Sequence, residues 1–123
     1  MNKTRLALIG AGRIGKIHLK AMSEVSEAEL VAIVDTNTEI EQLAKHFSVP
    51  FFQSSDKMLQ AVTPDGVIVC TPTDIHFGPV ASALKSGAHV LVEKPITQSV
   101  EEARKIISLS EQTFREVLVG HHR

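Results

Sequence analysis

Short apolar runs alternate along the chain with longer segments that mix apolar and charged residues. The apolar runs have the length and the valine and isoleucine content of β-strands. They predict strands over residues 5–9, 29–34, 49–52, 67–70, 89–92 and 116–119. The segments between them predict helices over residues 13–25, 38–47, 56–61, 78–86 and 99–113. One uninterrupted β–α series predicts an α/β fold, a doubly wound parallel sheet in a single domain with helices on both faces.

Several predicted elements carry residues that suit their ends. Ser99 and Glu102 have the spacing of a capping box at the start of the last helix. Residues 36–38 offer hydroxyl and amide side chains that can cap the helix that follows them. Gly87 is well placed just past the end of a helix, and Pro50 suits only an end or an edge of its strand. Right-handed crossovers leave the carboxyl ends of such strands along one edge of the sheet, where ligands bind.

A Gly-x-Gly-x-x-Gly turn comes directly after the first strand and reads Gly10-Ala11-Gly12-Arg13-Ile14-Gly15. Asp35 closes the second strand. A strand, a glycine turn, a helix, a second strand and an acid, in that order, are typical of the Rossmann fold that binds dinucleotides. The sequence therefore predicts that this turn, including Arg13 and Ile14, contacts a dinucleotide cofactor.

Each residue of the motif has a physical part in that prediction. Gly10 lets the chain turn sharply off the strand, and Gly12 lets the backbone approach a pyrophosphate at the positive end of the helix. Gly15 lets the helix pack closely against the strand. Asp35 can accept hydrogen bonds from both ribose hydroxyls and would repel a 2′-phosphate, which favours NAD over NADP. The alternative is a turn whose glycines are only structural and an aspartate that caps a helix.

Composition narrows the class of protein. The chain has 123 residues, 43% hydrophobic and 22% charged, as expected of one globular domain. The net charge of −1 gives no support for a nucleic acid or an anionic membrane as partner, and no apolar run is long enough to span a bilayer. Cys70 is expected to be a small buried residue in a reduced, cytoplasmic protein, with a reactive thiol as the alternative. We expect no metal, because adjacent His121 and His122 would point to opposite faces of a strand.

Two further motifs follow the fourth and fifth predicted strands and so fall at the same sheet edge as the glycine turn. They read Thr71-Pro72-Thr73-x-x-His76 and Glu93-Lys94-Pro95. Together with the glycine turn, His18 and residues 119–123, they resemble the cofactor domain of the Gfo/Idh/MocA oxidoreductases over nearly the whole chain. The resemblance implies hydride transfer between a nicotinamide ring and a hydroxyl or carbonyl carbon, mostly of sugars, polyols and their derivatives.

The resemblance also implies a catalytic residue. Lys94 matches the family lysine beside the nicotinamide, where an ammonium can hydrogen-bond to the reacting oxygen and stabilise developing negative charge. Glu93 would hold that lysine and contact the cofactor ribose, and Pro95 would stiffen the loop. The alternative is a surface loop with an ordinary solvated Glu–Lys pair.

The loop after the fourth strand is expected to bind cofactor as well. Thr71, Pro72 and Thr73 match the family loop that runs along the adenine-ribose and pyrophosphate portion. His76 is expected to order this loop or to approach the nicotinamide side, with capping of the next helix as the alternative. His18 lies on a partly buried face of the first helix, where it is expected to pack or to form a hydrogen bond to a loop.

The sequence departs from the family in one respect. Hydride-transfer members carry a second domain, an open antiparallel sheet that binds substrate and supplies an acid/base histidine, and nothing in residues 1–123 matches it. We therefore expect residues 1–123 to form the dinucleotide-binding domain alone, to bind cofactor with little turnover, and to meet a small-molecule substrate through the second domain. Exposed surface meant for that domain is expected to favour self-association.

Three other functions stay open from the sequence. A stand-alone NAD-binding regulatory or sensing module needs no second domain. Another nicotinamide-dependent reductase could use the same fold. A methyltransferase that uses S-adenosylmethionine is disfavoured, because it commonly has an acidic residue where this chain has Ile9, and it has no use for residues 93–95.

Overall fold

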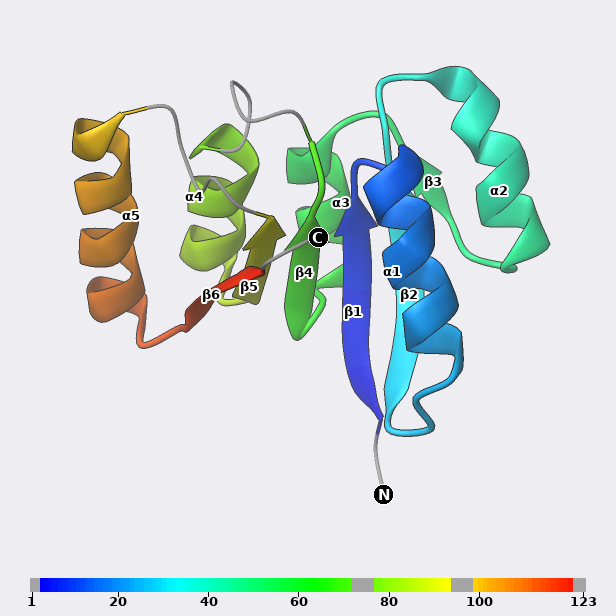
Figure 1. Cartoon of the computed structure of the whole chain (residues 1–123), viewed down its shortest axis with the longest axis horizontal. Helices are drawn as coiled ribbons and strands as arrows, with labels where there is room; N and C mark the ends of the chain where they lie inside the picture. The colour runs from blue at the N-terminus through cyan, green and yellow to red at the C-terminus, as the bar shows by residue number, and fades with distance from the viewer. Residues whose placement is uncertain (1–2, 72–76, 94–98, 121–123) are drawn as a thin grey trace.

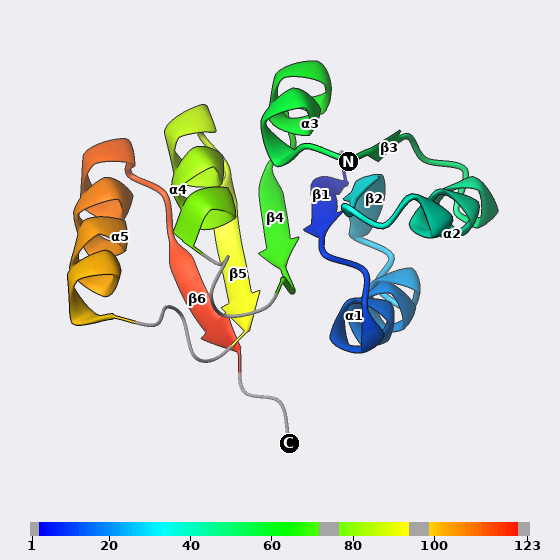
Figure 2. The ribbon, with the colours of Figure 1, turned by 90° about the horizontal axis from the view of Figure 1, so that it is seen from above.

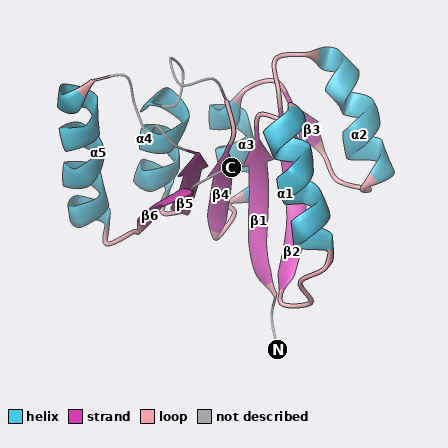
Figure 3. Cartoon of the chain, in the orientation of Figure 1, coloured by secondary structure: helices cyan, strands magenta, loops and turns pink. Residues whose placement is uncertain are grey.

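A computed structural model describes residues 3–71, 77–93 and 99–120, apart from the side chains of Arg13, Ile14 and Glu93. Within these ranges the strands are β1 (Thr4–Ile9), β2 (Ala28–Val34), β3 (Phe51–Phe52), β4 (Gly66–Val69), β5 (His89–Glu93) and β6 (Val117–Gly120). The α-helices are α1 (Arg13–Ser23), α2 (Glu41–His46), α3 (Ser55–Val62), α4 (Phe77–Ser86) and α5 (Val100–Thr113), and a 3₁₀ turn, η1 (Thr38–Ile40), precedes α2 (Figure 3). None of the described helices is both long and apolar enough to cross a bilayer.

All strands pair in parallel, in the order β3-β2-β1-β4-β5-β6 (Figure 1). The direction of winding changes between β1 and β4, which is the switch point where Rossmann sheets bind ligands. Seen from above, α1 and α2 lie on one face of the sheet and α3, α4 and α5 on the other (Figure 2). The predicted doubly wound parallel sheet with helices on both faces is confirmed.

The alternation of side chains along the strands divides the core into two apolar clusters. On the face of α1 and α2, Leu8 and Ile33 pack against helical residues that include Met22. On the opposite face, Val67 and Val69 pack against Met58, Leu84 and Ile106 from α3, α4 and α5. Every residue of β4 is buried, which explains why its sequence is continuously apolar.

The predicted helix and strand ends are confirmed where a capping side chain or glycine was identified. Asn37 caps η1 by accepting a hydrogen bond from the backbone N–H of Glu39, and Ser99 caps α5 by accepting one from that of Glu102. Gly87 follows α4 with φ of +96°, and the next N–H, that of Ala88, donates to Ala83 O at 3.0 Å. This bond pattern satisfies the last carbonyls of the helix.

Other boundaries differ from the prediction because backbone groups find different partners. Residues 38–40 form a 3₁₀ turn rather than α-helix, since Ile40 N–H donates to Asn37 O at 3.1 Å. The first helix ends at Ser23 instead of residue 25, where Val25 N–H closes a tight bond to Met22 O. The strand predicted over 67–70 covers Gly66–Val69 instead, and Cys70 is half-buried just past its end rather than fully buried.

Strand β3 is shorter than the predicted 49–52. The N–H of Val49 donates to Ala44 O at 3.0 Å and so completes the end of α2 instead of joining the sheet. Pairing reaches Pro50 only through its carbonyl, which accepts from Ile33 N–H at 3.1 Å. The proline therefore lies just before an edge strand, where its missing N–H leaves no gap in the ladder.

Candidate functional site

The carboxyl ends of four strands meet at one level of one sheet edge. Ile9 of β1 pairs with Val34 of β2 and with Val69 of β4, and Val69 pairs in turn with Val92 of β5. The residues that follow these positions are Gly10, Asp35, Cys70 and Glu93. The register thus brings the glycine turn, the acidic residue and the starts of two loops to the same edge, as the sequence predicts.

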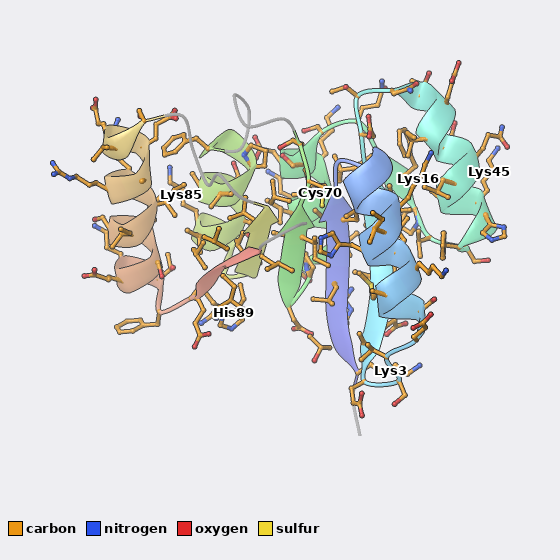
Figure 4. The ribbon with its side chains drawn as sticks, viewed as in Figure 1. Lys3, Lys16, Lys45, Cys70, Lys85 and His89 are labelled. Carbon is orange, nitrogen blue, oxygen red and sulfur yellow. The ribbon has the colours of Figure 1, made fainter. Side chains whose placement is uncertain are left out.

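Gly10 stands where β1 and β4 leave the sheet together. Its φ is +90°, and a Cβ built on it would lie 2.8 Å from Thr71 N and 2.9 Å from the carbonyl carbon of Cys70. Figure 4 shows Cys70 at this junction, and its N–H donates to Ile9 O at 2.8 Å. Glycine is needed here for the backbone conformation and for the close approach of two chain segments.

The other two glycines of the motif differ from each other. A Cβ on Gly15 would lie 2.3 Å from Gly10 O, so this glycine lets α1 pack directly against the turn. A Cβ on Gly12 would meet nothing within 4 Å among the described residues. Packing among the described residues therefore does not require glycine at position 12, and it leaves space there that a ligand can use.

The start of α1 offers donors beside that space. Gly12 is the N-cap, no side chain caps the helix there, and its first turn carries no acidic residue. The first N–H groups of a helix have no partners within the helix and lie at its positive end, so they attract anions. By contrast, α5 begins with the Ser99 cap and with Glu101 and Glu102 in its first turn. One of its first N–H groups thus has a partner, and two acidic residues compensate its positive end.

Asp35 stands half-buried at the end of β2 with both carboxylate oxygens engaged. Oδ2 accepts from Ala11 N–H at 2.9 Å, and Oδ1 accepts from Asn37 N–H at 2.9 Å. The helix cap at this point is Asn37 rather than Asp35, contrary to the alternative drawn from the sequence. Each carboxylate oxygen can accept a further bond, so Asp35 retains the capacity to bind the hydroxyls of a ribose.

The profile of one protein family matches almost the entire chain. The profile of the oxidoreductase family GFO_IDH_MocA, described as having an NAD-binding Rossmann fold, matches residues 4–121. The chain belongs to the Gfo/Idh/MocA family. The resemblance drawn from the glycine turn and the two loop motifs is thereby confirmed, together with the Rossmann fold that it implies.

Curated relatives of this Gfo/Idh/MocA chain extend well beyond it. It is 32% identical over 123 residues to the rhizopine catabolism protein MocA of Rhizobium meliloti, covering 100% of this chain and 39% of that protein. It is 34% identical over 120 residues to inositol 2-dehydrogenase of Rhizobium meliloti strain 1021, covering 97% and 36%. The chain thus spans a little over a third of the length of these proteins.

Solved structures of dehydrogenases share the fold of this Gfo/Idh/MocA chain closely. The scyllo-inositol dehydrogenase of Lactobacillus casei with bound NAD(H) and scyllo-inositol superposes with a TM-score of 0.90 at 28% identity, covering 97% of this chain and 36% of that one. The WlbA dehydrogenase of Bordetella pertussis, in complex with NADH and UDP-GlcNAcA, gives a TM-score of 0.92 at 29% identity, covering 97% and 37%.

The predicted site residues fall into two groups in the structure. Gly10, Gly12, Gly15, Asp35 and Thr71 lie together at the sheet edge, and Thr71 is half-buried just after β4. The others lie outside the described residues, either whole (Pro72, Thr73, His76, Lys94, Pro95) or in their side chains (Arg13, Ile14, Glu93). His121 and His122 also lie outside, whereas His18 is half-buried on α1 as predicted.

One participant in the site was missed from the sequence. The backbone N–H of Ala11 joins the glycine turn to Asp35, and every residue type except proline carries this donor. No pattern of side chains could therefore have indicated it. A contact of this kind becomes visible only when the register of β1 against β2 is known.

Proposed function

We propose that this chain is the NAD(H)-binding domain of an oxidoreductase that moves a hydride between a nicotinamide ring and a CH–OH or carbonyl carbon of a sugar- or polyol-like substrate. The observation that carries the proposal is that a Cβ at Gly12, the N-cap of α1, would meet nothing within 4 Å among the described residues, next to the residue whose N–H binds Asp35. Related proteins include inositol 2-dehydrogenase and D-glucoside 3-dehydrogenase.

The residues at this edge fit a dinucleotide. Backbone N–H groups at the start of α1 would hold the pyrophosphate, which the absence of a Cβ at Gly12 lets come close. The carboxylate of Asp35 would accept hydrogen bonds from the hydroxyls of the adenosine ribose. A 2′-phosphate would bring two more negative charges against the same carboxylate, so NAD is the expected cofactor rather than NADP.

The catalytic part of the proposal rests on the motifs after β4 and β5. The bound nicotinamide would supply or accept the hydride. Lys94 would hydrogen-bond to the reacting oxygen of the substrate and stabilise its developing negative charge. Glu93 would orient Lys94, with Pro95 stiffening their loop. Thr71, with Pro72, Thr73 and His76, would line the cofactor.

We further propose that residues 1–123 act as one cofactor-binding domain and that substrate selection belongs to a further domain. Support comes from the relatives, of which the match to this chain covers only 39% and 36%. The domain alone is then expected to bind cofactor with little turnover. A reduced, cytoplasmic setting is proposed because the chain has a single cysteine, Cys70.

Calorimetric titration of the chain with NADH and NADPH tests the cofactor assignment. We expect NADH to bind at least about tenfold more tightly, the size of one unfavourable charge contact. S-Adenosylmethionine, titrated as the control ligand, should give no binding heat. A folded sample that binds neither nicotinamide cofactor, or that prefers NADPH, would rule out the assignment.

A further inference from the structure

Two successive N–H groups of the glycine turn are held by the last residue of β2 and by the residue that follows it. Gly10 N–H donates to Val34 O at 2.8 Å, which is the last rung of the backbone ladder between β1 and β2. Ala11 N–H donates to the side chain of Asp35, at Oδ2, at 2.9 Å. Where β1 bends out of the sheet, a carboxylate has taken the place of the next backbone acceptor.

The acceptor for Ala11 N–H is the side chain of Asp35, whose own backbone N–H points away from β1 toward the other neighbour of β2. That backbone N–H donates to Phe52 O at 3.1 Å and continues the pairing with β3. The side chain is itself fixed by a second donor, since Oδ1 accepts from Asn37 N–H at 2.9 Å. The carboxylate is therefore held from both sides by backbone N–H groups of the chain itself.

The environment of Ala11 makes this bond consequential. Ala11 is fully buried at 0% exposure, and a buried N–H that loses its acceptor is costly. Its neighbour Gly12 is the N-cap of α1 and borders the open space. A rotation of the peptide units around Ala11 would therefore change the direction of the donors that face that space.

Building on the proposed function, we propose that Asp35 is a positioning residue for the phosphate-binding turn, in addition to its contact with the ribose. By accepting from Ala11 N–H, the carboxylate holds Gly10–Gly12 in the conformation that presents the start of α1 to a diphosphate. Asp35 then raises the affinity of the chain for the diphosphate group itself. It does so even when the ligand that carries the diphosphate has no ribose hydroxyls.

Electrostatic repulsion alone predicts that Asp35 lowers the affinity for a diphosphate, whereas the proposal predicts that it raises this affinity. The difference makes the proposal testable. A carboxylate near a diphosphate repels it, so removing the charge alone would leave affinity for such a ligand unchanged or increased. If the carboxylate also holds the turn, its removal lowers that affinity. The two effects can be told apart, because only the loss of the hydrogen bond that holds the turn raises the dissociation constant.

The experiment compares ADP with 2′,3′-dideoxy-ADP, which lacks both ribose hydroxyls, on the wild-type chain and on Asp35→Ala. Calorimetry should show that Asp35→Ala weakens dideoxy-ADP by about three- to tenfold, the value of one hydrogen bond, and weakens ADP further. An unchanged or tighter dissociation constant for dideoxy-ADP in Asp35→Ala would overturn the proposal. Asp35→Asn keeps one acceptor oxygen, so its dissociation constant for dideoxy-ADP should lie between those of the wild-type chain and Asp35→Ala.

The chain contains a matched control. Asp65 Oδ2 accepts from the backbone N–H of Arg5 at 2.8 Å, the same type of bond at the opposite end of β1. Asp65→Ala should leave the dissociation constants of both nucleotides unchanged. If Asp65→Ala weakens them as much as Asp35→Ala does, the effect is a general loss of stability and the positioning role is rejected.

Amide hydrogen exchange without ligand reads the turn directly. Exchange at Ala11 should accelerate in Asp35→Ala and not in Asp65→Ala, and unchanged protection of Ala11 would contradict the proposal. This measurement also separates two kinds of failure. If the folded wild-type chain binds neither ADP nor NADH, the proposed function fails, while exchange at Ala11 still decides whether Asp35 holds the turn.

Discussion

At each end of β1 a backbone N–H donates to an aspartate that lies far away in the sequence. Arg5 N–H bonds to Asp65 at the amino end, and Ala11 N–H bonds to Asp35 at the carboxyl end, with lengths of 2.8 Å and 2.9 Å. The two bonds are chemically alike. The two ends differ in whether the polar groups around each bond have hydrogen-bond partners within the chain.

At the amino end, those groups are used by the chain itself. The guanidinium of Arg5 donates to Val62 O at 2.8 Å and to Thr63 O at 2.9 Å, which caps the end of α3. Asp65 O accepts from His89 N–H at 3.0 Å. At the carboxyl end, no described side chain caps the start of α1, and a Cβ on Gly12 would meet none of the described residues within 4 Å. A ligand site is therefore marked by backbone N–H groups that the described residues leave without a partner, rather than by the presence of a carboxylate.

The largest expected effect is that of Gly15→Ala, which would push α1 away from the turn. Its Cβ would lie 2.3 Å from Gly10 O, so backbone must move, and we expect a loss of about 3 kcal/mol in the free energy of unfolding. Urea denaturation measures it. The control is Gly78→Ala in α4, whose Cβ meets nothing within 4 Å among the described residues and should not destabilise the chain. Equal stability of the two variants would contradict the packing at Gly15.

Gly12→Ala should separate binding from stability at the carboxyl end. The new Cβ occupies the space proposed for the diphosphate, so we expect NADH affinity to fall at least about tenfold, or 1.4 kcal/mol. The free energy of unfolding should change by less than about 0.5 kcal/mol, because the weaker N-cap is offset by a stiffer unfolded chain. Calorimetry and urea denaturation together decide. Full NADH affinity in this variant would mean that the diphosphate lies elsewhere.

Arg5→Met should show the reverse behaviour at the amino end. The variant keeps the apolar stem and loses the two hydrogen bonds to Val62 and Thr63, so we expect a loss of about 1 kcal/mol in stability. The dissociation constant for NADH should stay within about twofold of the wild-type value. A larger change in binding would show that the two ends of β1 are energetically coupled.

The smallest effect is expected for Ser99→Ala, which removes the N-cap of α5. The Ser99 hydroxyl accepts from Glu102 N–H at 3.1 Å, and losing an exposed cap costs about 0.5 to 1 kcal/mol. Thermal unfolding with and without NADH measures both consequences. The stabilisation by NADH should be the same as in the wild-type chain, and a reduced ligand effect would assign α5 a part in binding.

The fold could be predicted from the sequence because its signals are local and repeated. Apolar runs marked every strand, and the residues at the ends of helices, such as Asn37, Ser99 and Gly87, marked several boundaries. The errors arose where a backbone group chose between two partners. Val49, for example, completes α2 instead of extending β3, and its side chain gives no sign of that choice.

The site was predicted in part, for a related reason. The close packing at Gly10 and Gly15 requires residues without a side chain. The bond from the glycine turn requires a side-chain acceptor, which Asp35 provides. The bond from Ala11 was invisible because it involves a backbone donor and depends on the register of two strands. The catalytic assignment of Lys94 rests on family likeness and stays a prediction.

The contact of Gly10 with Thr71 has a consequence for the order of folding. The turn reaches its final shape only when β4 docks beside β1, and the pairing of Leu6 with Gly66 spans half the chain. Closing such a loop is slow compared with forming α1 or its turn locally. A nascent or partly folded chain would display the glycine motif without being able to hold a nucleotide. Nucleotide affinity should therefore emerge late in refolding, together with the centre of the sheet.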